Sequence, residues 1–124
     1  MTNAGVENLY LERNSSSGAY AGGNGVFLVA SAFCWVVNCE TYRPIGAHVK
    51  MNGTYRCVIR DSYFHEGHTY GSGRTYGVML FCDGAGSGNP PRANSDNLIE
   101  NNIFYHCRHS MIFEGGGTGN VFGY

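Results

Sequence analysis

Charged residues and long apolar runs are both scarce in this sequence of 124 residues. Charged side chains make up 14% of it and the formal net charge is -1, so the chain as a whole offers no strong field for nucleic acid or an anionic membrane. No apolar run approaches the roughly 18 residues that a membrane-spanning helix needs. The first residues, Met1–Gly5, lack the basic start and apolar core of a signal peptide. We therefore expect no nucleic-acid partner and no membrane span.

The cysteines also lack the spacing of a metal site. Their number, five, is odd, and no two of them form a C-x-x-C pair. We expect them to be small buried residues that fill space, although a single disulfide remains open. They are Cys34, Cys39, Cys57, Cys82 and Cys107.

Short apolar segments bounded by Gly, Asn and Asp are plentiful, and they recur in two kinds. They are four or five residues long and rich in Val, Ile and Phe, which is typical of strands. The first kind comprises Gly25–Val29, Ala47–Met51, Gly77–Phe81 and Ser110–Glu114. The second kind comprises Trp35–Asn38, Cys57–Arg60, Asn97–Glu100 and Asn120–Gly123. This alternation predicts an internal repeat.

The spacing of the segments predicts a solenoid with a basic coil of 22 residues. Ten residues separate the starts of successive first and second segments in three coils, and 12 lead from Trp35 to Ala47. Two Gly-rich runs, His65–Arg74 and Asp83–Arg92, are insertions into this period. In such a stack each strand pairs with its equivalent in the next coil, so like side chains form columns.

The period of 22 predicts which side chains share a column. Phe27, Val49, Met79 and Ile112 should form one interior stack. Val26, His48, Val78 and Met111 should then face outward. In the second kind of strand, Val36, Val58, Leu98 and Val121 should align, and further on Tyr42, Phe64 and Phe104 should form an aromatic stack. Val6–Glu12 is predicted to be one earlier strand of the second kind.

Several of these segments resemble a known superfamily. Asn97–Phe104 is similar to the Asn-rich repeat of the right-handed parallel β-helix, or pectate-lyase-like, superfamily. Cys57–His65, Arg108–Met111 and Gly119–Tyr124 resemble bacterial β-helix repeat proteins of unassigned activity within it. The resemblance implies an all-β fold, a right-handed parallel β-helix of about four to five coils. We expect residues 1–124 to be a single segment of a longer β-helix domain, because neither end shows a cap.

The superfamily contains lyases, hydrolases, tailspikes and adhesins, so the resemblance leaves the function open. It implies a polysaccharide-active protein, outside the cell or on its surface, and we favour a lyase-like enzyme that acts on acidic glycans. A glycoside hydrolase remains a second possible activity. The alternative is a β-helix without catalysis that binds glycans or serves as an adhesin or tailspike shaft. A polysaccharide or oligosaccharide is the expected partner in each case.

Basic residues gather in the turn that leads from the second kind of strand to the first. A β-elimination needs a base for the C5 proton and a cation beside the carboxylate. Arg108 is the candidate cation, because guanidinium binds a carboxylate with two hydrogen bonds. His109 and His106 are the candidate bases, because imidazole titrates near neutrality. The predicted substrate-binding residues are Arg43, His48, His65, His68, Arg74, Tyr76 and Tyr63, with Tyr70 and Tyr105 as further exposed rings and loops 65–76 and 83–96 as walls.

Each of these residues also has a structural interpretation. His106, Arg108 and His109 could cap strand ends, and most of the tyrosines could serve packing. A hydrolase would need two facing carboxylates, for which Asp61 and Glu66 are among the best-placed acids. The sequence has no Asp pair of the type that polygalacturonases use and no acidic cluster of the type that calcium-dependent pectate lyases use. We therefore expect no cofactor; calcium stays open as an alternative, although no acidic cluster supports it.

Overall fold

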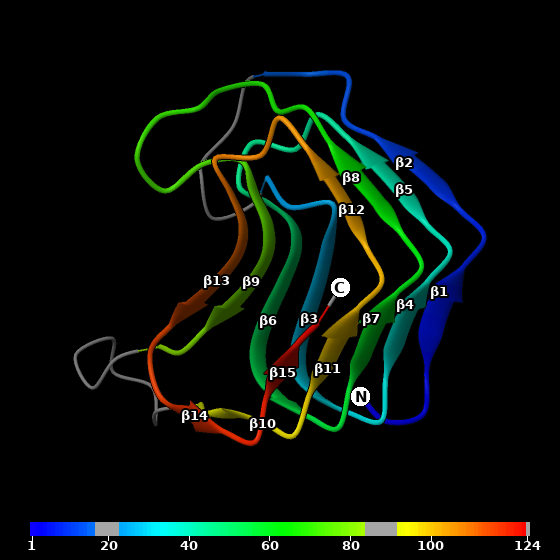
Figure 1. Ribbon diagram of the computed structural model, residues 1–124, viewed down its shortest axis with the longest axis vertical. Helices are drawn as coiled ribbons and strands as arrows, with labels where there is room; N and C mark the ends of the chain where they lie inside the picture. Colours follow the sequence, from blue (N-terminus) through cyan, green and yellow to red (C-terminus); the bar gives the residue numbers. More distant parts are fainter. Residues whose placement is uncertain (17–22, 84–91, 124) are drawn as a thin grey trace.

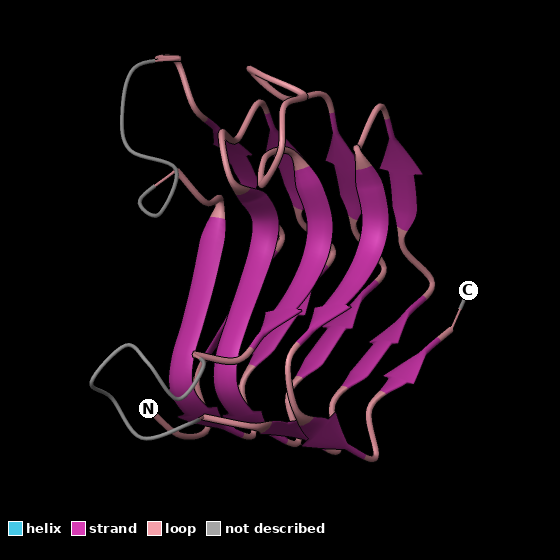
Figure 2. Ribbon diagram, turned by 90° about the vertical axis from the view of Figure 1, so that its left-hand side faces the viewer, coloured by secondary structure: helices cyan, strands magenta, loops and turns pink. Residues whose placement is uncertain are grey.

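The computed structural model describes residues 1–16, 23–83 and 92–123. These residues contain strands and turns but no helix, and every strand pairing among them is parallel. The chain winds through three sheets in turn and climbs by one rung per coil, as Figures 1 and 2 show. The predicted right-handed parallel β-helix is confirmed.

One of the three sheets contains strands of six to nine residues, whereas the other two consist of strands of two or three. The five-strand sheet has the order β1 (Gly5–Glu7), β4 (Trp35–Val37), β7 (Val58–Arg60), β11 (Leu98–Glu100) and β15 (Val121–Phe122). The four-strand sheet contains β2 (Tyr10–Glu12), β5 (Glu40–Tyr42), β8 (Tyr63–His65) and β12 (Ile103–Tyr105). The long-strand sheet contains β3 (Val26–Ala32), β6 (Ala47–Tyr55), β9 (Tyr76–Phe81) and β13 (His109–Glu114), extended by β10 (Asn94–Ser95) and β14 (Gly117–Thr118).

A column of left-handed residues makes the bend between the five-strand and four-strand sheets. Asn8, Asn38, Asp61 and Asn101 follow their strands directly and have φ values of 56°, 51°, 56° and 49°. Asn and Asp tolerate this conformation better than other non-Gly residues. The same bend divides the predicted strand Val6–Glu12, which is two strands, β1 and β2, separated at Asn8.

Amide side chains that are buried, as at Asn97, or half-buried, as at Asn102 and Asn120, satisfy backbone groups where the chain turns. Asn97 Oδ1 accepts a hydrogen bond from Cys57 N at 2.9 Å, and Asn120 Oδ1 accepts one from Asn97 N at 3.1 Å. Asn102 Oδ1 accepts one from Ser62 N at 3.1 Å. These bonds matter because an unpaired backbone donor is costly inside a protein. The Asn-rich pattern of the sequence is therefore structural at these positions.

The interior is apolar and continuous along the stack. One inner column contains Val36, Ile59 and Ile99, which are fully buried. Phe64 and Phe104 pack at 5.5 Å between ring centroids in another, so the predicted alignment of these two rings is confirmed.

The predicted period is wrong by one residue, because the uninterrupted coil contains 23 residues. Trp35 pairs with Val58, Val26 with Val49, and Leu98 with Val121. The predicted period counts one coil from Trp35 to Cys57, whereas the equivalent of Cys57 is Cys34. Each of these cysteines directly precedes its strand, β7 and β4 respectively. Since successive residues of a strand point to opposite faces, a slip of one residue inverts the predicted face.

This slip overturns the predicted interior stack. Phe27 pairs with Lys50, Lys50 with Met79, and Met79 with Ile112, and the Phe27 side chain is 44% exposed. Val49 belongs to the neighbouring column, which is part of the interior and consists of Val26, Val49, Val78 and Met111. Tyr42 likewise leaves the aromatic stack, where Thr41 pairs with Phe64, and Val36 aligns with Ile59 instead of Val58.

Candidate functional site

The outer face of the four-strand sheet carries an array of tyrosines and acids. In each of its strands the central residue faces inward, namely Leu11, Thr41, Phe64 and Phe104. The residues on either side of each centre therefore face outward. We call this surface the tyrosine face; it consists of Tyr10, Glu12, Glu40, Tyr42, Tyr63, His65, Ile103 and Tyr105.

Rings on the tyrosine face pack side by side. The Tyr63 and His65 rings lie almost parallel, with centroids 4.1 Å apart and an interplanar angle of 5°. The centroid of the Tyr42 ring lies 4.9 Å from that of His65, its partner on the next rung. Tyr10 and Tyr105 are 54% and 51% exposed. The face therefore offers aromatic surface that is held in place by short strands and still open to solvent.

Two carboxylates on the face are held by their neighbours. His65 Nε2 donates a hydrogen bond to Glu40 Oε1 at 2.9 Å. The Tyr10 hydroxyl donates to Glu12 Oε2 at 3.0 Å. Partial desolvation, this hydrogen bond and the nearby charges of Glu12 and Glu40 raise the pKa of Tyr10. The neighbourhood of Tyr10 is therefore acidic.

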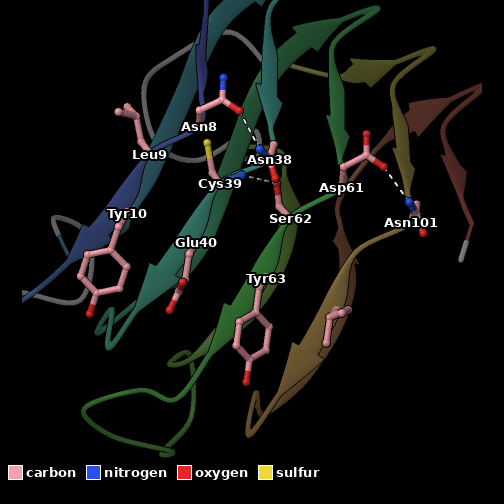
Figure 3. A pocket seen from close by; sticks show the side chains of 11 residues that line it. Asn8, Leu9, Tyr10, Asn38, Cys39, Glu40, Asp61, Ser62, Tyr63 and Asn101 are labelled. Atoms are coloured by element: carbon pink, nitrogen blue, oxygen red, sulfur yellow. Dashed lines mark hydrogen bonds between the residues drawn. The ribbon is translucent and has the colours of Figure 1, made fainter.

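A groove of about 550 Å³ runs beside the bend and opens onto the face (Figure 3). In Figure 3 the side chains of Tyr10, Glu40 and Tyr63 project from three successive rungs toward the same side. Its other wall is the turn column, where Asn38 Nδ2 donates to Asn8 Oδ1 at 2.6 Å and Asn101 Nδ2 donates to Asp61 Oδ1 at 2.6 Å. The described lining residues are Asn8, Leu9, Tyr10, Asn38, Cys39, Glu40, Asp61, Ser62, Tyr63, Asn101 and Ile103.

A histidine–carboxylate pair lies next to the tyrosine face. Glu66 and His106 directly follow β8 and β12, and both have positive φ values, 58° and 50°. His106 Nδ1 lies 3.1 Å from Glu66 Oε1, and the Tyr70 hydroxyl donates to Glu66 Oε2 at 3.0 Å. Burial acts in the opposite direction, but the hydrogen bonds from Tyr70 and His106 lower the pKa of Glu66. The His106 ring stacks on Tyr105 at 4.2 Å, so this pair continues the tyrosine face.

Arg108 and His109, predicted to act with His106, lie around Tyr76. The Arg108 guanidinium lies 5.9 Å from the centroid of the Tyr76 ring, and it donates to Gly71 O at 3.1 Å. The His109 ring stacks on Tyr76 at 5.6 Å. Tyr76 itself is only 6% exposed, so its predicted exposure is wrong. The Tyr76 ring supports these two exposed side chains from below.

His48 was predicted to face outward and bind substrate, but the structure buries it completely. Its Nδ1 is hydrogen-bonded to the Thr41 hydroxyl, and its Nε2 lies 3.0 Å from the backbone oxygen of Glu66. A Cβ atom added at Gly25 would lie 2.6 Å from the His48 backbone oxygen, so the interior is closely packed here. Desolvation by burial lowers the pKa of His48 to about 3. His48 is therefore a neutral core residue.

The remaining predicted residues spread along the same edge without meeting at one point. Arg43 is exposed, with its guanidinium 4.9 Å from the centroid of the Tyr42 ring. His68 Nε2 lies 2.7 Å from the Arg13 backbone oxygen, and Arg74 Nη1 donates to Thr69 Oγ1 at 3.2 Å. Of the predicted walls, 65–76 is described, whereas residues 84–91 of the other lie outside the described residues.

Sequence reasoning found Tyr63, His65 and Tyr105 but missed the surface to which they belong. Tyr10, Glu40 and Tyr42 were not selected as site residues, and Glu66 was considered only as a hydrolase acid. The signal was present in the alternation around Leu11, Thr41, Phe64 and Phe104, once the coil is read as 23 residues. With a period of 22, Tyr42 was placed inside.

The five cysteines are free thiols, and three of them, Cys34, Cys39 and Cys57, are buried. No group of three or more His, Cys, Asp or Glu residues is placed to hold a metal ion within 1–16, 23–83 and 92–123. In the same described ranges, no helix has the length and apolar character needed to cross a membrane.

Parallel strands stacked rung on rung, with side chains in columns on both faces, define a β-solenoid. The family described as the right handed beta helix region matches residues 2–123. The chain belongs to this family. Neither the search of curated proteins nor the search of solved structures found a match.

Proposed function

We propose that this β-helix recognises carbohydrate and binds a glycan chain across the tyrosine face. The observation that carries the proposal is the outward array of four tyrosines on consecutive rungs, beside a groove of about 550 Å³. A tyrosine ring offers a flat apolar surface and a hydroxyl that donates and accepts hydrogen bonds. Sugar rings present the same combination of C–H faces and hydroxyls, so the two surfaces are complementary.

The repeat of the scaffold suits a polymer. Neighbouring rungs are about 4.8 Å apart, so the face presents equivalent positions at a constant interval. A groove that opens along the stack can therefore contact several sugar units of one chain. Amides of the turn column, such as Asn8 and Asn38, supply donors and acceptors along one wall. A polymer of this kind is met outside the cell or at its surface, where we expect the protein.

The test is a set of binding isotherms with neutral, acidic and basic oligosaccharides. Tyr63→Ala removes one stacking ring, and we expect it to weaken binding about fivefold, which corresponds to ~1 kcal/mol. The matched control is Tyr55→Ala, because Tyr55 is also exposed, at 39%, but lies at the end of β6, away from the face. Equal affinity of the Tyr63→Ala variant and the unsubstituted protein for every oligosaccharide bound would refute the proposal, as would failure of all of them to bind.

A second candidate function is cleavage of an acidic glycan by β-elimination at the His106 edge. It is favoured by the Glu66 carboxylate, which orients His106 through Nδ1, and by Arg108 two residues further on. His106 would take the C5 proton of a uronate, whose carboxylate Arg108 would neutralise. The C4–O bond then breaks, a C4–C5 double bond forms, and the leaving oxygen takes up a proton. His109 is the alternative base.

Ultraviolet absorbance of unsaturated ends separates the two functions. We expect His106→Ala and Arg108→Ala to abolish any cleavage while leaving binding at Tyr63 intact. The control is His68→Ala, since His68 lies on the same edge but bonds to the Arg13 backbone. If acidic polymers are cut equally fast by all three variants, the assignment of the base and the cation is wrong.

A further inference from the structure

The charges of the groove point to the class of sugar. Among the described lining residues of the groove, Glu40 and Asp61 carry carboxylates, and none is a lysine, arginine or histidine. Glu12, next to Tyr10, adds a third carboxylate at the end of the face. A site lined by one sign of charge raises the local concentration of ligands of the opposite sign. A uronate polymer would meet like charge there.

Glu40 is placed to contact a ligand. It occupies the rung between Tyr10 and Tyr63, with which it pairs on either side, and Figure 3 shows its carboxylate beside both rings. Its Oε1 accepts a hydrogen bond from His65, whereas Oε2 has no partner among the described residues. The two rings flank it about one strand spacing away, ~4.8 Å on each side. A cation bound to Oε2 would therefore also approach an aromatic face, which attracts ammonium groups.

Asp61 faces the groove from the opposite wall. Asn101 donates to its Oδ1 at 2.6 Å, and Arg60 lies 3.5 Å from its Oδ2. Arg60 itself contributes to the surface of the five-strand sheet and not to the groove. The hydrogen bond from Asn101 therefore holds the Asp61 carboxylate on the turn column, and Arg60 partly compensates its charge. Glu40 is the stronger candidate for direct contact.

We infer that the groove recognises an amino sugar, with the protonated amine of a glucosamine unit at Glu40 Oε2 and sugar rings on Tyr10 and Tyr63. This inference rests on the proposed glycan-binding function and names its ligand class. An N-acetylated unit has no charge at this position and loses the ion pair. A uronate unit carries the opposite charge and is disfavoured.

The experiment compares three oligosaccharides of equal length by calorimetry at about pH 6, where an aliphatic amine is protonated. They are glucosamine, N-acetylglucosamine and galacturonate oligomers. We expect the glucosamine oligomer to bind best and its affinity to fall with added salt. Glu40→Gln keeps the size of the side chain and removes its charge, and we expect it to weaken glucosamine binding about fivefold. Glu100→Gln is the matched control, because Glu100 lies on the outer face of the five-strand sheet.

Each outcome is decisive. Equal binding of the N-acetylated oligomer, unaffected by Glu40→Gln, would overturn the inference and leave glycan recognition standing. Preferential binding of galacturonate would overturn the inference in favour of an acidic partner. Absence of binding by all three would overturn the inference, and extension of the panel to other neutral sugars would then decide the proposed function by itself. Circular dichroism of each variant confirms that it is folded.

Discussion

The buried imidazole of His48 makes the stability of the solenoid dependent on pH. His48 is fully buried beneath the edge of the four-strand sheet, where it packs against Phe64 at 5.7 Å between ring centroids. Its hydrogen bonds suit the neutral ring: Nε2–H donates to Glu66 O, and Nδ1 accepts from the Thr41 hydroxyl. Protonation would place a donor on both nitrogens and a charge in an apolar site.

The magnitude follows from linkage. Desolvation lowers the pKa of His48 from 6.5 to about 3 in the folded protein, so between these values the unfolded chain binds more protons than the folded one. The free energy of unfolding therefore falls as the pH falls below about 6.5. Between pH ~7.5 and ~4.5 the expected loss is roughly 3 kcal/mol. That is a large part of the stability of a typical domain.

The perturbation is His48→Gln, which retains one donor and one acceptor but does not titrate in this range. Urea unfolding, followed by circular dichroism, gives the free energy of unfolding of the variant and of the unsubstituted protein at both pH values. We expect the variant to be less stable at pH ~7.5, because glutamine packs less well against Phe64, and to lose about 3 kcal/mol less on acidification. His109→Gln is the control, because His109 is exposed.

The difference between the two pH dependences contains no contribution from the carboxylates that both proteins share, including Glu66. Equal losses of stability by the two proteins on acidification would show that His48 is not held neutral by burial. The same conclusion follows if nuclear magnetic resonance shows the His48 ring titrating near its ordinary value in the folded protein.

Three further predictions concern the interior. Phe64→Ala should lower the free energy of unfolding by about 3–5 kcal/mol, measured by urea unfolding, because the fully buried ring leaves a cavity; a loss under 1 kcal/mol would contradict the packing. Asn97→Leu should cost about 1–3 kcal/mol in the same assay by leaving Cys57 N without its acceptor, whereas Asn14→Leu, an exposed control, should cost little. Burial raises the pKa of the Cys107 thiol to about 11, so its alkylation near pH 8 should be about a hundredfold slower in the folded protein than in denaturant. Peptide mass spectrometry measures the two rates, and equal rates would contradict the burial of this thiol.

The architecture could be predicted from the sequence, but the faces of individual strands could not. Recurrence of short apolar segments indicates a stack, and this conclusion stays valid when the period is wrong by one residue. The assignment of side chains to the inner or outer face is then inverted, because side chains alternate along a strand. Phe64 and Phe104 are aligned correctly because each lies seven residues after an equivalent corner residue, Cys57 and Asn97. Tyr42 was misplaced because the count from its own coil began one residue late.

The error has a physical origin in the corner residues. Cys34 and Cys57 stand where the later coils carry Asn97 and Asn120, directly before a strand. The predicted segments of the second kind are counted from this corner residue at Cys57, Asn97 and Asn120, but from the residue after it, Trp35, in the coil of Cys34. The coil of Cys34 is therefore one residue out of register with the later coils. A repeat is best counted from its polar corners.

A second column of corner residues, at the other end of the five-strand sheet, explains why the groove lies where it does. The left-handed column Asn8, Asn38, Asp61 and Asn101 turns the chain sharply between two sheets. Because these residues have positive φ, their side chains leave the turn toward solvent, where they bond along the stack in the pairs Asn8–Asn38 and Asp61–Asn101. The strands that follow begin two residues later, with Tyr10, Glu40, Tyr63 and Ile103. A sharp bend with long side chains just beyond it creates a channel parallel to the stack, so its length grows with every coil. The proposed recognition of an extended ligand there needs no loop or lid, only repetition of the coil, and the proposal predicts that substitutions such as Tyr63→Ala weaken binding without changing the fold.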